Sequence, residues 1–510
     1  MSQGIDISDF SGGLNTRDGA GGIADNEIAE SQNCYLVKRG YAKRKGYSRY
    51  TGTSRIDGAE AGYHVSYAPF VSAAKTIGVA GSKVAYVTGG AWSDITASVS
   101  LTGTRPAVST MINDNFVACN GTDPAWYWSG SGDAATLSGD NIPTSPTTCE
   151  QFSGRLFLAD ERTLYWSGWM GEWTKFNAKD YQPFSSVING LKVIGDSQQS
   201  VLTIFCDRGV HICQFTPSVE QAIGGRGAFT FDTLSDSSGC AAPASVQEVY
   251  VPNLGYAIVW ADYDGLKIYN PAIGIDKMTD KIRDDWDALD LSQIANFTGT
   301  FYRNKGWYIL NCRSTSGSMN DKQIIIDLNN SNPSAADPDK RWIISGVFNW
   351  ESSVFGTTRE SGVEILLGCD GDGYWNRYDY TQNDNGTAIV GYFKTKSFDA
   401  GLPHYRKGLQ SLGLHYTYFG KYTLDITAYY DHLGERYNVE HTTTAGVTLG
   451  SFVLDQDILG ETEQLVVTNQ EMRGWGRTIQ LEIRNEEEGQ PFRIHKLQPQ
   501  FRVGRQSILS

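Results

Sequence analysis

The stretch that decides the fold is Gly154-Arg155-Leu156-Phe157-Leu158-Ala159, followed by Thr163-Leu164-Tyr165-Trp166-Ser167-Gly168. Each run is short, apolar and rich in residues that favour strands, and three polar residues separate the two runs. Two such runs joined by a short polar turn are typical of antiparallel strands. The stretch therefore predicts a β-hairpin.

Hairpins of the same kind recur from about residue 60 to residue 385. One pairs Asn115–Gly121 with Ala125–Gly130, and another pairs Tyr256–Trp260 with Gly265–Tyr269. The units follow each other at a spacing of about 40 to 50 residues, which is the range of propeller blades. We count six or seven such units. The sequence thus predicts a β-propeller-like domain with inserted loops over residues 60–387, with a large β-sandwich as the alternative fold.

The pattern changes after residue 388. Residues 422–429 and 477–484 alternate between apolar and polar side chains, as strands do when one face of their sheet is buried. This predicts an antiparallel β-sandwich over residues 388–510. Residues 1–59 are assigned to an N-terminal arm with the first strands. The predicted fold class is all-β with very little helix. Residues 280–291 are the best helical segment, with an acidic loop as the alternative.

Composition and charge limit the functions that this chain can have. Its 510 residues hold 43 Lys and Arg against 57 Asp and Glu, a formal net charge of −14. Such a balance disfavours a sequence-reading DNA binder, yet an acidic wall would let a duplex slide past without sticking. The eight scattered cysteines contain no C-x-x-C spacing and are interpreted as buried, reduced thiols. We expect no signal peptide and no membrane-spanning segment.

Familiar catalytic motifs do not occur in the sequence. It lacks a G-x-x-x-x-G-K-S/T phosphate loop, an H-E-x-x-H zinc motif and a G-x-S-x-G elbow. The turn Asp370-Gly371-Asp372-Gly373 is similar to half a calcium loop but has no further acid at the required spacing. A hairpin turn is the preferred interpretation, and a metal at Asp370 and Asp372 stays open. We predict no enzymatic activity, no cofactor and no metal site.

Two further groups of residues suggest a glycan site. Closely spaced carboxylates suit glycan hydrolysis, and they occur at Asp284, Asp285, Asp287 and Asp290. Exposed indole rings suit sugar stacking, and the relevant tryptophans are Trp126, Trp128, Trp166 and Trp169. Packing between blades is the stronger interpretation of the tryptophans, because propeller cores are built from such residues.

The first fifty residues carry a recognisable order of motifs. Phe10-Ser11-Gly12-Gly13-Leu14-Asn15-Thr16-Arg17 is followed by Asp25-Asn26-Glu27, by Asn33 and by a basic run over 38–49. This order resembles the N-termini of bacteriophage tail hub and nozzle proteins, which are also called tail accessory factors or packaged-DNA stabilisation proteins. Weaker resemblances continue along the chain at residues 154–168, 239–246 and 392–399.

The resemblance implies a structural virion protein of a short-tailed phage. Such a protein would form a homo-oligomeric ring, hexameric by the resemblance, that joins the portal adaptor ring and extends its DNA channel. It would retain the packaged genome, conduct it during ejection through transient, non-specific contacts with double-stranded DNA, and carry tail fibres or spikes. It would assemble in the host cytoplasm and reside in the virion tail.

Two sets of charged residues are assigned roles as hypotheses. A docking strap to an acidic neighbouring ring is predicted from six cations in twelve residues: Lys38, Arg39, Lys43, Arg44, Lys45 and Arg49. The four acids from Asp284 to Asp290 and the polar loop Asn329–Asp339 are predicted to face the lumen or the tip. The alternative functions are a glycan-binding or glycan-degrading tail protein that acts on the host surface, and a free-standing propeller lectin.

Overall fold

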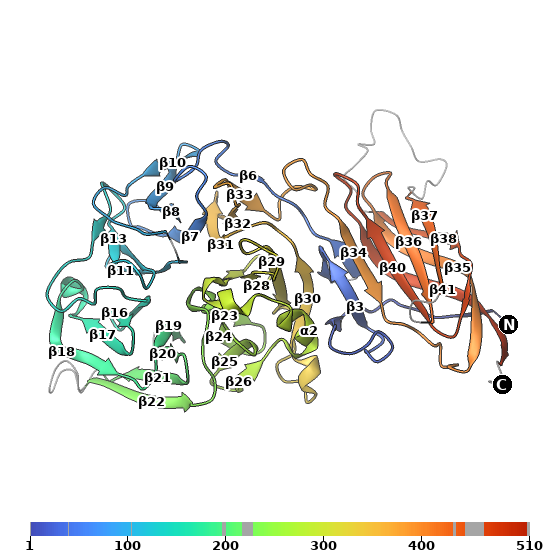
Figure 1. Cartoon of the computed structure of the whole chain (residues 1–510), viewed down its shortest axis with the longest axis horizontal. Helices are drawn as coiled ribbons and strands as arrows, with labels where there is room; N and C mark the ends of the chain where they lie inside the picture. Colours follow the sequence, from blue (N-terminus) through green and yellow to red (C-terminus); the bar gives the residue numbers. More distant parts are fainter. Residues whose placement is uncertain are drawn as a thin grey trace.

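The computed structural model describes residues 2–38, 40–103, 105–195, 200–216, 228–431, 435–443 and 464–506. The chain forms two β domains side by side, a propeller and a sandwich, and both termini lie at the outer end of the sandwich (Figure 1). Nearly all regular structure is strand, which confirms the predicted all-β class.

The propeller contains seven four-stranded antiparallel sheets, so the blade number is seven. Blades one to three are built from β7 (Gly62–Ala68), β8 (Lys75–Ala80), β9 (Lys83–Thr88), β10 (Ala91–Asp94), β11 (Val108–Ile112), β12 (Asn115–Cys119), β13 (Trp126–Trp128), β14 (Ala135–Thr136), β15 (Thr148–Phe152), β16 (Arg155–Asp160), β17 (Thr163–Ser167) and β18 (Phe176–Pro183). Blades four to six are built from β19 (Ile188–Ile194), β20 (Val201–Cys206), β21 (Val210–Phe215), β22 (Phe229–Ser235), β23 (Gln247–Val251), β24 (Gly255–Asp262), β25 (Gly265–Asn270), β26 (Gly274–Lys277), β27 (Thr298–Tyr302), β28 (Trp307–Cys312), β29 (Lys322–Asp327) and β30 (Ile343–Phe348).

Local turn chemistry explains why these segments form hairpins. In blade three, Ser153 and Gly154 both have positive φ angles, 48° and 73°, between β15 and β16. Asn113 and Asp114, between β11 and β12, also have positive φ angles, of 46° and 59°. Two successive residues with positive φ are typical of the type I′ turn, whose twist matches that of the strands it joins.

The seventh blade is completed by the N-terminal part of the chain. Its strands are β31 (Val354–Glu360), β32 (Val363–Cys369), β33 (Trp375–Tyr378) and β6 (Ser48–Arg49). Ser48 pairs with Arg377, and Arg49 pairs with Asn376. The guanidinium groups of Arg49 and Arg55 lie 3.6 and 3.7 Å from the ring centre of Tyr374. The ring of blades is thus closed by segments more than 300 residues apart.

Helices are few and short among the described residues. They are η1 (Met170–Glu172), η3 (Pro243–Ser245), η4 (Asp280–Ile282), α2 (Arg283–Asp287), η5 (Leu291–Asn296) and η6 (Pro338–Lys340). The predicted helical segment at 280–291 therefore contains a single α-helical turn flanked by 3₁₀ turns. Trp286 anchors it, because its side chain is buried and its Nε1 donates to the Tyr263 carbonyl at 3.0 Å.

The sandwich combines strands from both ends of the chain. One sheet has the order β38-β35-β41-β5-β4, with β1 on β41 and β39 on β35, and the other has the order β2-β3-β34-β40-β36-β37. The strands are β1 (Ser2–Gly4), β2 (Gly13–Leu14), β3 (Glu27–Gln32), β4 (Cys34–Val37), β5 (Gly40–Lys43), β34 (Gly391–Thr395), β35 (Tyr405–Tyr418), β36 (Thr423–Tyr430), β37 (Glu435–Thr442), β38 (Gln464–Glu471), β39 (Trp475–Gly476), β40 (Ile479–Asn485) and β41 (Arg493–Gln506).

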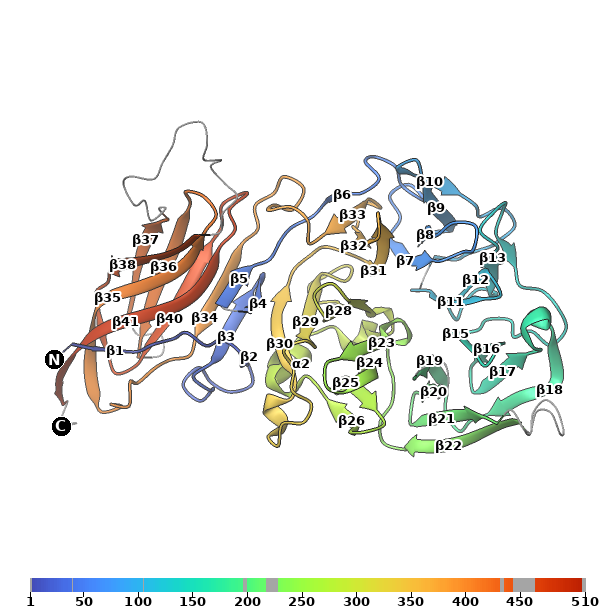
Figure 2. The ribbon, with the colours of Figure 1, turned by 180° about the vertical axis from the view of Figure 1, so that it is seen from behind.

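The N-terminal strands correct the predicted domain boundaries. Strands β1 to β5 belong to the sandwich and β6 belongs to the propeller, so residues 1–59 do not form a separate arm. Figure 2 shows β2 to β5 between the C-terminal strands and blade six. A single hydrophobic core runs through this junction, where Leu14 and Ile28 of the sandwich join Ile343 and Ile344 of the propeller. Hydrophobic burial therefore joins the two domains.

The predicted alternation in the sandwich is borne out along β36, where Leu424, Ile426 and Ala428 are buried and the residues between them are partly exposed. Glu482 in β40 departs from this pattern. Its side chain is buried although its neighbours on that face are polar, because Tyr429 donates to it at 2.7 Å and Lys394 lies 3.8 Å away.

Candidate functional site

The axis of the propeller is surrounded by the first strand of each blade. Adjacent inner strands run parallel, as contacts between blades two, three and four show. Cys149 Sγ donates to the Val108 carbonyl at 3.5 Å, and Gln151 N donates to Thr110 Oγ1 at 3.2 Å. One blade further, Leu191 N donates to Thr148 Oγ1 at 3.3 Å. Parallel inner strands present the same strand ends, and thus the same class of turns, on each face of the propeller.

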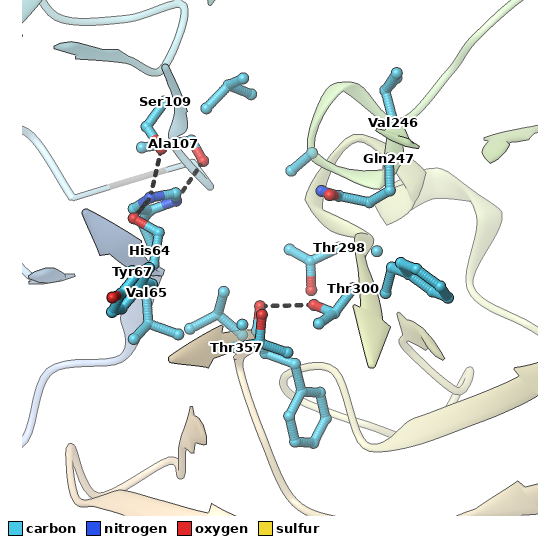
Figure 3. Close-up of a pocket in the computed structure, with 18 of the residues that line it drawn as sticks. His64, Val65, Tyr67, Ala107, Ser109, Val246, Gln247, Thr298, Thr300 and Thr357 are labelled. Atoms are coloured by element: carbon cyan, nitrogen blue, oxygen red, sulfur yellow. Dashed lines mark hydrogen bonds between the residues drawn. The ribbon is translucent and has the colours of Figure 1, made fainter. Parts of the chain in front are cut away.

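A cavity of about 470 Å³ lies on this axis. Figure 3 shows its two walls, with His64, Tyr67, Ser109 and Thr357 on one side and Gln247, Thr298 and Thr300 on the other. The volume falls within the range of about 300–1,000 Å³ that is typical of small-molecule pockets. Most of these side chains carry hydroxyl, amide or imidazole groups, so the cavity suits a polar ligand.

His64 is fixed in one neutral tautomer. Its Nδ1 lies 3.0 Å from the Ala107 carbonyl, which can only accept, so Nδ1 carries the proton. Nε2 then has one lone pair with which to accept, and the hydroxyls of Ser66 and Ser109 each lie 3.0 Å from it. Burial lowers the pKa of His64 to about 4, because the charged imidazolium loses hydration. At neutral pH this side chain adds no charge to the cavity.

Charged groups gather on the wall formed by blades three to six. Lys192 and Glu150 form an ion pair at 3.0 Å. Glu248 follows in the next blade, and burial raises the pKa of its carboxyl, with Lys192 and Arg303 acting in the opposite direction. Among the described residues, no ion pair or hydrogen bond engages the Glu248 side chain. The carboxylate therefore keeps unused acceptor capacity beside two cations.

Two arginines from adjacent blades lie at one mouth of the cavity. Arg303 follows β27 and Arg359 belongs to β31, and both are exposed. Arg303 lies 6.0 Å from the Phe301 ring centre and Arg359 lies 5.6 Å from that of Tyr67. Within the described part of the chain, neither guanidinium forms an ion pair or a hydrogen bond. Glu364, which also lines the mouth, accepts a hydrogen bond from Asn304 N at 3.2 Å.

The structure places the cations of the predicted docking strap in different environments. Arg44 is buried and forms a two-point ion pair with Asp384, at 2.8 and 2.7 Å. Lys43 is also buried and donates to Asn485 Oδ1 at 2.7 Å, and burial lowers its pKa to about 8. Arg49 stacks on Tyr374. Lys43 and Arg44 hold the molecule itself together, which corrects the prediction that they bind a neighbour, whereas Arg49 is exposed.

Three cations of the strap, Lys38, Lys45 and Arg49, remain exposed at the surface. Lys38 and Lys45 lie on either side of β5. Arg39 lies outside the described residues.

The four predicted acids are brought together on and beside α2 but do different things. Asp285 accepts from Thr16 Oγ1 at 2.9 Å, and Asp287 pairs with Arg283 at 2.9 Å. Asp290 accepts from Ser292 Oγ at 2.5 Å and lies 3.5 Å from Arg313. Asp284 is exposed and, within the described chain, has no side-chain hydrogen bond or ion pair. Neighbouring residues therefore engage three of the four carboxylates.

The predicted loop Asn329–Asp339 lies between β29 and β30. Asp339 pairs with Arg17 at 2.8 Å, which ties the loop to the N-terminal motif. Directly after the loop, Arg341 and Trp342 both donate to Asp276 Oδ2, at 3.2 and 2.9 Å. At least this end of the loop thus belongs to the junction between the two domains.

The acidic turn at residue 370 is a hairpin turn between β32 and β33. Asp370 Oδ1 accepts from the backbone N–H groups of Asp372 and Tyr374, at 3.1 and 2.9 Å. Its other oxygen accepts from Asn376 Nδ2 at 3.0 Å. Within the described residues, no group of three or more His, Cys, Asp or Glu side chains has an arrangement that could hold a metal ion.

The aromatic residues are divided between core and surface. Trp126, Trp128 and Trp166 are completely enclosed between blades, in agreement with the packing interpretation, whereas Trp169 is 50% exposed. The cavity residues His64, Glu248, Arg303 and Arg359 were not predicted from the sequence. The sequence does contain a pattern that could have indicated a polar cavity, because polar residues recur in the first strand of several units, as in Thr298-Gly299-Thr300.

No family model matches the sequence, and no curated protein matches it. Solved structures with a similar fold include the WD40 β-propeller domain of Doa1, at 10% identity and a TM-score of 0.40, with 66% of this chain and 97% of that chain covered. Another is BBS1N in complex with ARL6DN, at 9% identity and a TM-score of 0.40, with 66% and 96% covered. A third is YCF48 bound to a D1 peptide, at 10% identity and a TM-score of 0.36, with 64% and 93% covered. These likenesses concern the propeller fold alone.

The helices of the described residues were compared with the length and apolar character of membrane-spanning helices. None of them has the length and apolar character that a membrane-crossing helix requires.

Proposed function

We propose that this chain is a non-enzymatic structural protein of a phage tail, the subunit of a hub or nozzle ring that extends the DNA channel of the portal adaptor. The observation that carries the proposal is the place of the motif behind the resemblance. Residues 10–17 form the joint between propeller and sandwich, so the motif serves the architecture of the subunit. By the resemblance, the ring would be hexameric, carry fibres or spikes and reside in the virion tail.

The joint is built from close backbone contacts and a buried ion pair. Lys281 of the propeller pairs with Glu27 of the sandwich at 2.8 Å, and both side chains are more than nine-tenths buried. The same ammonium group donates to the Gly12 carbonyl at 3.0 Å. The backbone N–H groups of Thr16 and Arg17 both donate to the Lys281 carbonyl at 2.9 Å. A joint of this kind suits a subunit that must hold its shape under the pressure of a packaged genome.

The size of the propeller cavity decides where DNA would pass. A cavity of about 470 Å³ accommodates a small ligand. A duplex has grooves that are each roughly 8 Å deep, and it cannot enter such a space. The lumen of the proposed ring is therefore enclosed between subunits, and the axis of each propeller serves another purpose.

The net charge favours a channel through which DNA slides. Six subunits at −14 each give a ring with a formal charge of −84. Acidic walls repel phosphate groups and keep the duplex from adhering, whereas a DNA binder neutralises phosphates with Lys and Arg. Asp284, which is exposed and has no side-chain partner within the described chain, is the member of the predicted acidic group best suited to face the lumen.

The purified chain tests the proposal directly. Its mass and two-dimensional class averages are measured alone and with the adaptor ring of the same phage. We expect a closed ring, or a ring that closes on the adaptor, with a lumen wide enough for a duplex. A chain that stays monomeric under both conditions contradicts the proposal.

A charge reversal tests two of the exposed docking residues. Lys38→Glu combined with Lys45→Glu is expected to weaken adaptor binding by about tenfold and to lower its dependence on salt, because both ammonium groups are exposed. Lys179→Glu, on the outer strand β18, is the matched control and should bind normally. Equal binding by the double variant and the control would contradict the strap hypothesis while leaving the ring proposal intact.

A further inference from the structure

The propeller cavity has a composition that the proposed ring does not explain. It is too small to admit a DNA duplex, and its polar groups come from blades far apart in the sequence. We propose that it is a binding site for a sugar acid, a ligand of about one or two sugar rings that carries hydroxyl groups and one carboxylate. This inference stands independently of the ring proposal.

The charged groups of the cavity indicate which ligands fit. Five charged side chains line the cavity, three bases and two acids: Lys192, Arg303, Arg359, Glu248 and Glu364. Glu150 does not line it but forms the ion pair with Lys192. With Glu150 included, the formal charges cancel, so the cavity and its paired acid together attract neither plain anions nor plain cations. Lys192 and Glu150 pair with each other, and Asn304 donates to Glu364. The hydrogen-bonding capacity that is left belongs to two guanidinium groups and one carboxylate.

These remaining groups require opposite kinds of partner. A guanidinium group is a donor that recognises a carboxylate in a two-point geometry. The Glu248 carboxylate is an acceptor and requires a hydroxyl or amine donor. Inorganic phosphate carries up to two negative charges at neutral pH and would be repelled by Glu248, and a neutral sugar leaves the arginines without an anion. A hydroxylated acid satisfies both requirements.

The opposite wall completes the site. Thr357 and Tyr67 offer hydroxyl groups that can both donate and accept, which suits sugar hydroxyls. Ser109, whose hydroxyl lies 3.0 Å from His64 Nε2, can still accept a hydrogen bond. Gln247 adds an amide that has no hydrogen bond within the described chain. His64 is neutral and adds no charge. The volume of about 470 Å³ matches the proposed ligand size.

Binding to the full chain tests this inference. Glucuronate, galacturonate and N-acetylneuraminate are titrated by calorimetry and by saturation-transfer NMR, with glucose and inorganic phosphate as comparison ligands. We expect at least one acid to bind with a dissociation constant of about 1 mM or tighter. Glucose and phosphate should bind at least about tenfold more weakly, since glucose has no anionic group for the arginines and phosphate, with up to two negative charges, is repelled by Glu248.

Three variants locate the site. Arg303→Gln and Arg359→Gln should each weaken binding of the acid at least about tenfold, whereas Arg473→Gln, an exposed arginine of the sandwich, should not change it. Glu248→Gln distinguishes a sugar acid from a plain anion by the direction of its effect. It should weaken a ligand that donates a hydroxyl to the carboxylate, and it should strengthen a ligand that the carboxylate repels.

Each contrary result overturns the inference. It fails if none of the three acids binds at about 10 mM, a concentration that would detect affinities far weaker than those of specific sites. It also fails if phosphate binds as well as the acids, if Glu248→Gln strengthens binding, or if the arginine variants bind like the Arg473 control. The substituted arginines are exposed, so thermal melting should show folded variants in every case.

Discussion

Arg44 illustrates how much a single side chain contributes to this molecule. Its guanidinium is 1% exposed and lies among Asp384, Asn33 and Asn349, with the Trp350 ring centre 5.2 Å away. These partners come from the strand junction of the sandwich and from blades six and seven. A buried guanidinium with so many acceptors is a structural group, because its removal leaves several of them without a donor.

We expect Arg44→Gln to lower the free energy of unfolding by about 3–5 kcal/mol, since it leaves the Asp384 carboxylate without its cation. Arg44→Lys should recover only part of this loss, because an ammonium cannot make the two-point contact. Lys45→Gln is the control, and as an exposed neighbour it should change stability by less than about 0.5 kcal/mol. Urea denaturation measures all three variants, and an Arg44→Gln protein as stable as the control would contradict this role.

At the residue scale, the sequence predicts which side chains are buried better than it predicts which residues they form ion pairs or hydrogen bonds with. Alternation along residues 422–429 identifies the buried side chains of β36 because a strand has a fixed period. Arg44 appeared to be one of six surface cations, since its partner Asp384 is 340 positions away. The cavity residues were missed for the same reason: Glu248, Arg303 and Arg359 come together only when the blades close into a ring.

At the element scale, β6 shows what local signals cannot reveal. In the first six blades, the residues of a hairpin turn are adjacent in the sequence to the strands that they join, as at Ser153-Gly154. The blades could therefore be predicted from local sequence. Strand β6 is two residues long and pairs with β33 more than 300 residues later. Nothing near Ser48 in the sequence indicates that it closes the seventh blade. The assignment of β1 to β5 to the sandwich escaped prediction in the same way.

The closing strand can be tested through Tyr50, whose backbone N–H donates to the Trp375 carbonyl at 2.8 Å. Tyr50→Ala removes the side chain only, whereas Tyr50→Pro also removes this hydrogen bond. We expect the proline variant to be less stable than the alanine variant by about 1–3 kcal/mol, the cost of a buried carbonyl left without a donor. Hydrogen exchange should also be faster across residues 375–378. Equal exchange and stability in the two variants would show that β6 does not secure the blade.

At the scale of the whole molecule, the two domains behave as one body because their cores are continuous. The sequence allowed both domains to be predicted, yet it placed the boundary between them at residue 388 and assigned residues 1–59 to an N-terminal arm. The structure shows an interface in space, where β2 and β3 pack on β30. Gly13 is central to this contact. Its φ is +70°, and a β-carbon there would lie 2.6 Å from the Ile344 carbonyl oxygen.

Gly13→Ala should therefore weaken the coupling between the two domains, so that they unfold in separate transitions. The left-handed backbone alone costs a non-glycine residue roughly 1–3 kcal/mol, and the clash with blade six adds to this. In calorimetry we expect one unfolding transition for the natural chain, and two for the variant, with the sandwich melting first because it loses the support of the propeller. Gly19→Ala is the matched control, because a β-carbon at that exposed position meets no atom within 4 Å. A Gly13→Ala protein that melts in one unshifted transition, like the control, would mean that the joint does not couple the domains, and the rigid subunit that the proposed ring requires would lose its basis.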